Sequence, residues 1–390
     1  MLRSLYSGIS GLRSHQTMLD VTGNNIANVN TTAFKSSSTQ FQDTLSQLTQ
    51  SAGGPQALAG GTNPAQVGLG VRVAGISTNF AQGSTQATGR PTDLMISGDG
   101  FFVTQLGNQT LYTRAGSFDF DSAGRLVAPD GSVVQGWPAT NGVVNNGGPV
   151  GDVVLPRGAV VPAVATTSAT VGGNLPDDAA LGTALVRDSQ AYDGAGTARA
   201  LTLTYTRTAA GWDVSGVDAN GATATTALAF TNGALTTGGT LAIGGITVDM
   251  TKLTGFAGLT SVAVTNQDGR AAGSLETYAI GTDGTIVGQF SNGASQAIGR
   301  IVLASFVNPG GLEKAGASAY KSTLNSGIAQ IGTAGGGGVG ALNSGALEMS
   351  NVDLSQEFTN LIVAQRGFQA NARIITTSDE VLQELTNLKR

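Results

Sequence analysis

The chain has 390 residues and a formal net charge of −5 at pH 7, with few charged (12%) and aromatic (5%) residues and 58 glycines. Its length allows two or three domains with cores of their own, and its acidic balance gives no footprint for nucleic acid. The absence of cysteine excludes disulfides and thiolate chemistry, and a single histidine, His15, leaves no histidine-based metal site. No segment approaches the roughly 18 to 20 apolar residues of a membrane span, so we expect no membrane insertion.

Residues 1–28 have the apolar spacing of an amphipathic helix. Steps of three and four residues separate Leu2, Leu5, Ile9, Leu12, Gln16, Leu19, Gly23 and Ile26. A mean spacing of 3.5 residues is typical of a helix that wraps around another helix, and the segment Gly23-Asn24-Asn25 favours its end. Arg13 and Asp20 interrupt the apolar core that a cleaved secretory signal needs. We therefore expect any export to use a route without such a signal.

Residues 29–70 are predicted to form an extended arm. The stretch is rich in Gln, Ser and Thr, and a Gly/Pro segment covers residues 53–64. Few apolar residues are present to anchor it, so a compact unit is not expected.

From residue 71 the pattern becomes that of antiparallel β structure. Short apolar or alternating runs are separated by Asp-Gly and Asn-Gly pairs, from Asp99-Gly100 to Asn292-Gly293. Such pairs supply the positive φ angles that two-residue hairpin turns require. We predict a first β domain made of residues 71–149 and 273–331, with a second, outer β domain, residues 150–272, inserted into it.

The C-terminal part is predicted to be a glycine-rich linker, residues 332–349, followed by a helix, residues 350–390. The segment from Ser350 to Asp353 resembles a capping box, and Lys389-Arg390 suit the negative end of the helix dipole. The second heptad stripe consists of Leu354, Phe358, Leu361, Gln365, Phe368, Ala372, Ile375, Asp379 and Leu382. The fold class is therefore mainly β with terminal α-helices: two nested antiparallel β domains and a helical coiled-coil layer made of both ends.

The two stripes favour assembly between copies, because an isolated two-helix hairpin is only marginally stable. Polar seam residues such as Gln16, Gln365 and Asp379 can fix register and partner number. The alternative, that the stripes form an internal core, stays open at this stage. The candidate assembly residues are Leu5, Ile9, Leu12, Leu19, Leu354, Phe358, Leu361, Phe368, Ile375 and Leu382.

No constellation of catalytic, cofactor-binding or metal-ligating residues is predicted. Gly335, Gly337 and Gly340 match the spelling of a dinucleotide fingerprint, but no strand and helix are expected around them. Residues 119–124 begin like a calcium loop, but Ala123 replaces a ligand and Asp130 replaces the final glutamate. We expect a protein that is not an enzyme and has no cofactor.

Three blocks resemble the bacterial flagellar rod and hook protein family: residues 2–35, residues 92–103 with 112–118, and residues 350–388. The first block carries the family motif at Asn24, Asn25, Ala27, Asn28, Thr31, Phe34 and Lys35. The inserted region, residues 150–272, is what separates the hook branch of the family from the shorter rod branch. Residues 299–320 also resemble the hook branch.

The resemblance implies a structural subunit that self-assembles into a flexible extracellular tube, a universal joint that passes torque from motor and rod to filament. The implied partners are other copies of the chain, the distal rod protein, the hook cap, the hook–filament junction protein and the flagellar type III export apparatus. Glycine-rich segments 53–61 and 332–345 are expected to act as hinges. A distal rod protein and, from another class, a secreted β-rich adhesin or binding module remain as alternatives.

Overall fold

The computed structural model describes residues 2–55, 60–155, 158 and 160–387, and the chain divides into two compact units. Unit 1 comprises Met1–Leu155, Ala279–Val287 and Ala297–Arg390, and unit 2 comprises Pro156–Tyr278 and Gly288–Gln296. Unit 2 thus interrupts unit 1 in sequence, and the predicted insert, residues 150–272, overlaps most of it. The predicted class, mainly β with a helix at each end of the chain, is confirmed.

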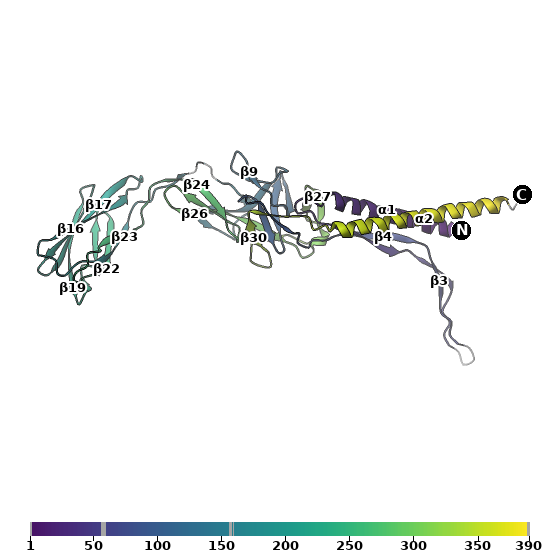
Figure 1. Ribbon diagram of the computed structural model, residues 1–390, viewed down its shortest axis with the longest axis horizontal. Coiled ribbons are helices and arrows are strands. Elements are labelled where there is room, and N and C mark those ends of the chain that lie inside the picture. Colours follow the sequence, from purple (N-terminus) through teal and green to yellow (C-terminus); the bar gives the residue numbers. More distant parts are fainter. Residues whose placement is uncertain (1, 56–59, 156–157, 159, 388–390) are drawn as a thin grey trace. The chain divides into compact units, whose positions relative to one another are not determined.

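The two helices of unit 1 are α1, Leu2–Ala27, and α2, Leu354–Asn387, and they lie side by side in antiparallel directions (Figure 1). The capping box predicted at Ser350 is wrong. Asp353 caps α2 instead, because its Oδ1 accepts the N–H groups of Ser355 (2.8 Å) and Gln356 (3.3 Å). Lys389 and Arg390 lie outside the described residues. No helix in the described ranges has both the length and the apolarity to cross a membrane.

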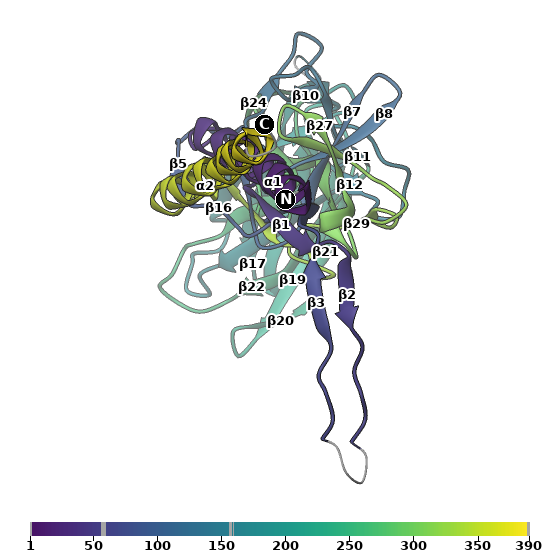
Figure 2. The same ribbon diagram turned by 90° about the vertical axis from the view of Figure 1, so that its right-hand side faces the viewer.

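The arm that follows α1 is a two-stranded antiparallel ribbon (Figure 2). Strand β1, Ser37–Asp43, pairs with β4, Val71–Thr78, and β2, Ser46–Gln50, pairs with β3, Ala65–Gly68. The ribbon therefore extends past the predicted arm boundary at residue 70. Within the predicted hinge 53–61, residues 56–59 lie outside the described residues, and Gly53 and Thr62 exchange backbone hydrogen bonds of 3.0 Å.

The main sheet of unit 1 contains the strand order β26-β11-β7-β8-β28-β27. One hydrophobic core cluster on this sheet consists of Phe101, Val103, Tyr112, Trp137, Val302, Ala304, Phe306 and Tyr320. The strands wholly or mainly in unit 1 are β5 Thr85–Ala87, β6 Leu94–Ser97, β7 Phe101–Leu106, β8 Gln109–Thr113, β9 Asp119–Phe120, β10 Leu126–Val127, β11 Val133–Thr140, β12 Val143–Val144, β13 Gly151–Asp152, β26 Ser295–Ser305, β27 Glu313–Gly316, β28 Ala319–Lys321, β29 Gln330–Thr333, β30 Ala341–Ser344 and β31 Ala346–Glu348, with a short 3-10 helix at Pro309–Gly311.

The linker predicted at residues 332–349 is wrong, and so is the hinge predicted at 332–345. Strand β30 pairs with β6 and β31 pairs with β5, so the segment is hydrogen-bonded to strands about 250 residues earlier. A Cβ on Gly340 would collide with the carbonyl oxygen of Ser97. Glycine is present at this position because two backbones approach closely, which is a packing role and not one of flexibility.

Unit 2 contains a sheet of strand order β16-β17-β18-β19-β20-β22-β15-β23, with β21 beside β22. Alternation along β17 buries Leu201, Leu203 and Tyr205 in a core that also holds Trp212. Strands β15 and β22 run parallel, which corrects the prediction of a wholly antiparallel insert. The remaining strands are β14 Val160–Val161, β15 Ser168–Asn174, β16 Ala184–Tyr192, β17 Ala198–Thr208, β18 Gly211–Asp218, β19 Thr223–Thr231, β20 Ala234–Thr237, β21 Thr240–Ile243, β22 Ile246–Thr254, β23 Ala263–Gln267, β24 Gly273–Ile280 and β25 Thr285–Phe290.

Candidate assembly interface

Helices α1 and α2 approach each other through residues with little or no side chain. A Cβ on Gly8 would lie 3.4 Å from Cγ1 of Ile375, and one on Gly11 would lie 2.6 Å from Oδ1 of Asn371. On α2, a Cβ on Gly367 would lie 2.5 Å from the imidazole of His15. The two helices are therefore closest at Gly11 and Gly367, where a Cβ would meet the end of a side chain of the other helix, whereas a Cβ on Gly8 would fit in ordinary contact.

The contact face of α1 differs from the predicted apolar stripe. The buried polar side chains on α1 are Ser14, Thr22 and Asn25, each no more than 4% exposed. At 3.6 residues per turn, Thr22 lies about a quarter-turn around the helix from Leu5 and Leu12, and Ser14 and Asn25 lie close to the opposite side of the helix. Close approach of two backbones leaves no room for leucine, so the large side chains lie beside the contact and not within it.

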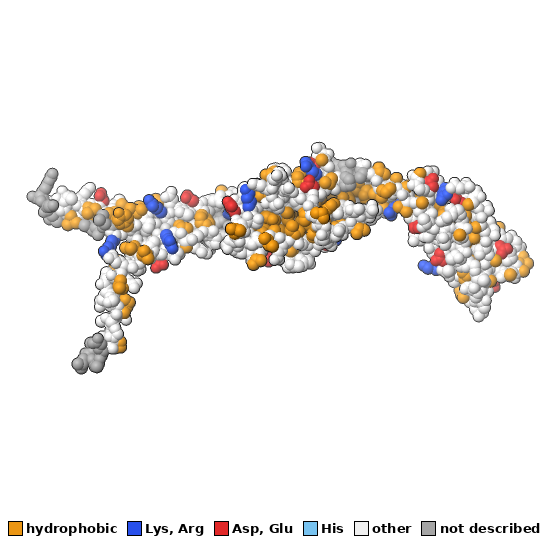
Figure 3. Space-filling view, turned by 180° about the vertical axis from the view of Figure 1, so that it is seen from behind, with side chains coloured by type: hydrophobic (Ala, Val, Ile, Leu, Met, Phe, Trp, Pro, Cys, Tyr) orange, Lys and Arg blue, Asp and Glu red, His pale blue; other side chains and the backbone are white. Residues whose placement is uncertain are grey.

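None of the ten candidate assembly residues is buried within the chain. Ile9, Leu354, Phe358 and Phe368 are exposed, whereas Leu5, Leu12, Leu19, Leu361, Ile375 and Leu382 are half-buried. Further exposed apolar residues on α2 are Ile362, Val363, Ile374, Val381 and Leu385, each between 44% and 56% exposed. Hydrophobic side chains accordingly appear at the surface of the helix pair in Figure 3. Several exposed apolar side chains on one helix pair indicate a site of protein–protein contact.

The motif residues at the end of α1 tie this helix to β1 and α2. Asn25 is 1% exposed, and its Nδ2 donates to the backbone oxygen of Ser37 (2.8 Å) and to Oε1 of Glu357 (3.1 Å). Its Oδ1 accepts the N–H of Ser37 at 3.0 Å. One buried amide thus fixes both the turn after α1 and the contact with the first turns of α2.

The other motif residues build the loop that leaves α1 after Ala27. Asn28 donates from Nδ2 to the side chain of Asn24 (3.2 Å), and its own Oδ1 accepts the hydroxyl of Thr31 (3.0 Å). Ala33 has a φ of 55°, a left-handed conformation unusual for alanine, and its N–H donates to the backbone oxygen of Glu348 at 2.8 Å. The loop is thus held against the segment that precedes α2.

The last motif residue, Lys35, is fully buried and paired with a fully buried carboxylate. Its Nζ lies 2.6 Å from Oε1 of Glu348, and it also donates to the backbone oxygen of Ala81 at 2.8 Å. Oε2 of Glu348 lies 3.4 Å from NH1 of Arg114, which is also buried. Burial lowers the pKa of Lys35, and the hydrogen bond and charge of Glu348 oppose that shift.

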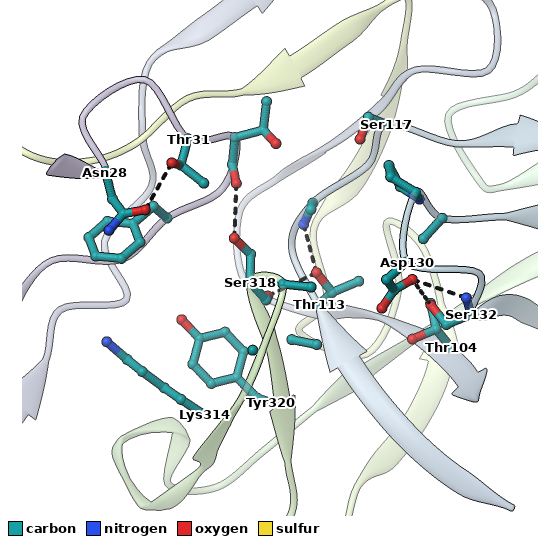
Figure 4. Close-up of a pocket in the computed structure, with 18 of the residues that line it drawn as sticks. Asn28, Thr31, Thr104, Thr113, Ser117, Asp130, Ser132, Lys314, Ser318 and Tyr320 are labelled. Carbon is teal, nitrogen blue, oxygen red and sulfur yellow. Dashed lines mark hydrogen bonds between the residues drawn. The ribbon is translucent and has the colours of Figure 1, made fainter. Parts of the chain in front are cut away.

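The motif loop also lines a cavity of about 440 Å³ (Figure 4). Thr31 and Phe34 line one side, and the turn between β27 and β28 lines another. Ser318 in that turn donates to the backbone oxygen of Thr32 at 3.3 Å, and Lys314 donates to the hydroxyl of Ser37 at 2.9 Å. The β27–β28 hairpin therefore holds the motif loop against the sheet of unit 1 through these hydrogen bonds.

Sequence reasoning missed Glu348, Asn351 and the helix-contact glycines. Asn351 accepts the N–H of Ser36 on Oδ1 (2.8 Å) and donates from Nδ2 to the backbone oxygens of Asn79 (2.8 Å) and Ala81 (3.1 Å). The one available signal was that Glu348 is the only acidic residue between Glu313 and Asp353. No group of His, Asp and Glu side chains suited to a metal ion occurs among the described residues.

A helix pair with exposed apolar side chains, in a chain that also contains β units, is typical of a structural protein that assembles with further copies. Family models match three segments of the chain. They are described as flagella basal body rod protein (residues 5–35), flagellar hook protein FlgE/F/G D1 domain (residues 95–174) and flagellar basal body rod FlgEFG protein C-terminal (residues 343–388).

Full-length relatives agree with these models. The chain is 41% identical to flagellar hook protein FlgE of Borreliella burgdorferi and 39% identical to that of Treponema pallidum, with all of each chain covered. It is 36% identical to flagellar basal-body rod protein FlgG of Bacillus subtilis, again with all of both chains covered. The chain belongs to the flagellar hook and rod protein family, and the predicted function, a structural subunit of the flagellar hook, is confirmed by the more similar relatives.

Proposed function

We propose that copies of this chain assemble through the exposed apolar surface of α1 and α2 into the tube of the flagellar hook. The observation that carries the proposal is that different residues of the helices make the contact within the chain and form the exposed apolar surface. Small residues such as Gly11 and Gly367 lie at the contact within one chain, which leaves Phe358, Val381 and Leu385 for neighbouring copies. The terminal helical domain, residues 1–28 and 350–390, is then the assembly domain.

The tube would act as a universal joint that passes torque from the rod to the filament. The proposed partners, besides further copies of the chain, are the distal rod protein, the hook cap, the hook–filament junction protein and the flagellar type III export apparatus. We propose export by that apparatus without a cleaved signal, to the part of the flagellum outside the cell. The heptad spacing of the exposed side chains supports assembly into a helical layer.

The test is electron microscopy of the purified full chain during salt-induced polymerisation, with the double variant Val381→Glu/Leu385→Glu beside it. The two introduced glutamates place negative charge on exposed apolar positions of α2. We therefore expect curved tubes from the parent chain and monomers from the variant. Thr359→Glu is the matched control, because Thr359 is an exposed polar residue of the same helix. Tubes from the double variant would show that this part of α2 is not the interface.

The same images distinguish the hook from the rod alternative. A hook subunit should give curved or supercoiled tubes whose curvature varies along their length. Straight, stiff tubes would favour the distal rod reading. A chain that stays monomeric while both helices remain protected from hydrogen exchange would favour a binding module whose stripes form an internal core.

A further inference from the structure

Glu348 is the meeting point of chain segments that are far apart in sequence. One oxygen, Oε1, accepts Lys35 Nζ (2.6 Å) and the N–H of Gly83 (2.8 Å), and the other lies 3.4 Å from Arg114. Lys35 comes from the N-terminal motif, Arg114 from the sheet and Glu348 from the segment before α2. All three side chains are at most 3% exposed.

The buried charges of this cluster are fully paired only when both ends of the chain are docked on the sheet. If the motif loop docked first, Lys35 would be buried with a backbone carbonyl for a partner but no counter-ion. If the segment before α2 docked first, Glu348 would still pair with Arg114, but Oε1 would lose its shortest contact. An uncompensated buried charge is strongly unfavourable, so each partial state is disfavoured relative to full docking.

The backbone around the cluster leaves little room for a loose arrangement. A Cβ on Gly83 would collide with the carbonyl oxygen of Met349, so these two segments are in direct backbone contact. Arg114 is held in place by donating to the backbone oxygens of Gly100 (2.9 Å) and Gly98 (2.7 Å). Arg114, which directly follows strand β8, is thus preorganised to receive Glu348.

We propose that Glu348 is a shared counter-ion that makes the docking of the two chain ends onto the sheet of unit 1 mutually dependent. The motif loop, residues 28–37, and the segment 344–352 then dock together or not at all. The cluster of Lys35, Arg114 and Glu348 requires both ends of one chain. In a subunit whose C-terminal segment is undocked, the N-terminal helix is therefore loosely held. When all three side chains are paired, this cluster joins the base of the helix pair to the sheet without a hinge at residues 332–345.

The test is hydrogen-exchange mass spectrometry on the monomeric full chain, with Lys35→Met and Glu348→Gln as separate variants. Lys35→Met removes the N-terminal partner only. We nevertheless expect exchange in residues 344–352 to rise at least tenfold, including at Met349, whose N–H donates to Ser84 and touches nothing that was changed. Glu348→Gln should raise exchange in both segments, including at Ala33.

Two controls keep the result interpretable. Arg90→Met removes an exposed ion pair with Asp119 and should leave both segments unchanged. The double variant Lys35→Met/Glu348→Gln keeps the net charge of the cluster at its native value, because one cation and one anion are lost together. We expect it to exchange more slowly than the sum of the single variants predicts.

Protection of β7 in each variant reports whether the sheet itself has unfolded. The proposal is overturned if Lys35→Met loosens residues 28–37 alone. It is also overturned if the single variants unfold the sheet and the double variant gives no rescue. Because every measurement is made on monomers, its outcome is independent of whether the chain forms tubes.

Discussion

His15 and Gly367 lie in direct contact where α1 crosses α2, with 2.5 Å between the imidazole and the position that a Cβ on Gly367 would take. A large side chain at residue 367 would force the helices apart. We expect Gly367→Leu to destabilise the helix pair by about 1–3 kcal/mol, the usual cost of overpacking. The measurement is thermal loss of helical circular dichroism together with hydrogen exchange of α1.

Gly23→Leu is the matched control, since a Cβ at Gly23 meets nothing within 4 Å. A leucine there should stabilise α1 slightly because glycine is a poor helix former. Equal effects of the two substitutions would show that the glycine contact does not hold the pair together.

The turn between β27 and β28 is strained, because Ala317 and Ser318 both have positive φ angles, 50° and 57°. Hairpin turns of this shape favour Asn or Gly. We expect Ala317→Asn to stabilise unit 1 by about 0.5–1 kcal/mol, because asparagine tolerates the left-handed region better than alanine. Ala317→Val should do the opposite.

Urea unfolding followed by Trp137 fluorescence measures this effect, in a Trp212→Phe background that leaves one tryptophan, in unit 1. Strand β28, Ala319–Lys321, contributes Tyr320 to the same core cluster as Trp137, so the reporter lies near the change. A stabilised Ala317→Val variant would contradict the strain argument.

Because of Asp268, we expect the stability of unit 2 to depend on pH in the acid range. Its burial acts to raise the pKa, but the hydroxyl of Thr167 and the N–H groups of Ser168 and Thr167 bind the carboxylate and lower the pKa to about 2. A carboxyl whose folded pKa lies below its ordinary value of 3.8 stabilises the fold above pH 3.8. That stabilisation is lost as the pH falls from 3.8 towards 2.

We therefore expect Asp268→Asn to lower the stability of unit 2 at pH 6 and the difference from the parent chain to vanish near pH 2. Trp212 fluorescence in a Trp137→Phe background reports unit 2 alone. Asp213→Asn, an exposed strand carboxylate of the same unit, serves as the control. A difference between Asp268→Asn and the parent that is constant from pH 6 to pH 2 would refute the linkage.

Tyr205 is fully buried in unit 2, and its hydroxyl has no hydrogen-bond partner among the described residues. Burial accordingly raises the pKa of Tyr205. We expect Tyr205→Phe to be neutral or to stabilise unit 2 by up to about 1 kcal/mol, because it removes an unpaired buried polar group. Leu203→Ala, in the same strand, should instead cost about 2–5 kcal/mol. Denaturant midpoints measured by Trp212 fluorescence compare the two, and a clear loss in Tyr205→Phe would indicate a partner for the hydroxyl.

Local pattern was sufficient to predict the class of each part of the chain. The 3.5-residue spacing predicted the two helices, and Asp-Gly and Asn-Gly pairs such as Asp283-Gly284 and Asn232-Gly233 marked real turns, with positive φ at their glycines. Periodicity and turn chemistry act within a few residues, so they can be read from a short window of sequence.

Local sequence patterns gave wrong predictions where contacts with a distant segment of the chain determine the structure. The glycine-rich composition of residues 332–349 predicted a linker, but β6 pairs with residues 341–344 and β5 pairs with residues 346–348. The heptad stripe located α1 correctly, yet Gly8 and Gly11, which lie off that stripe, face Asn371 of α2 at close range. Composition cannot distinguish a flexible glycine from one that another backbone touches.

The sequence by itself determined the helices at both ends, the β structure between them and the membership of the family. The tertiary structure decided which face of each helix is free for other copies and which charges are buried. Lys35 and Glu348 show the reason: they are separated by 313 positions in the chain, and their pairing exists only where the fold brings both ends to one sheet. Burial and partnership are properties of contacts between distant residues, and no local pattern encodes them.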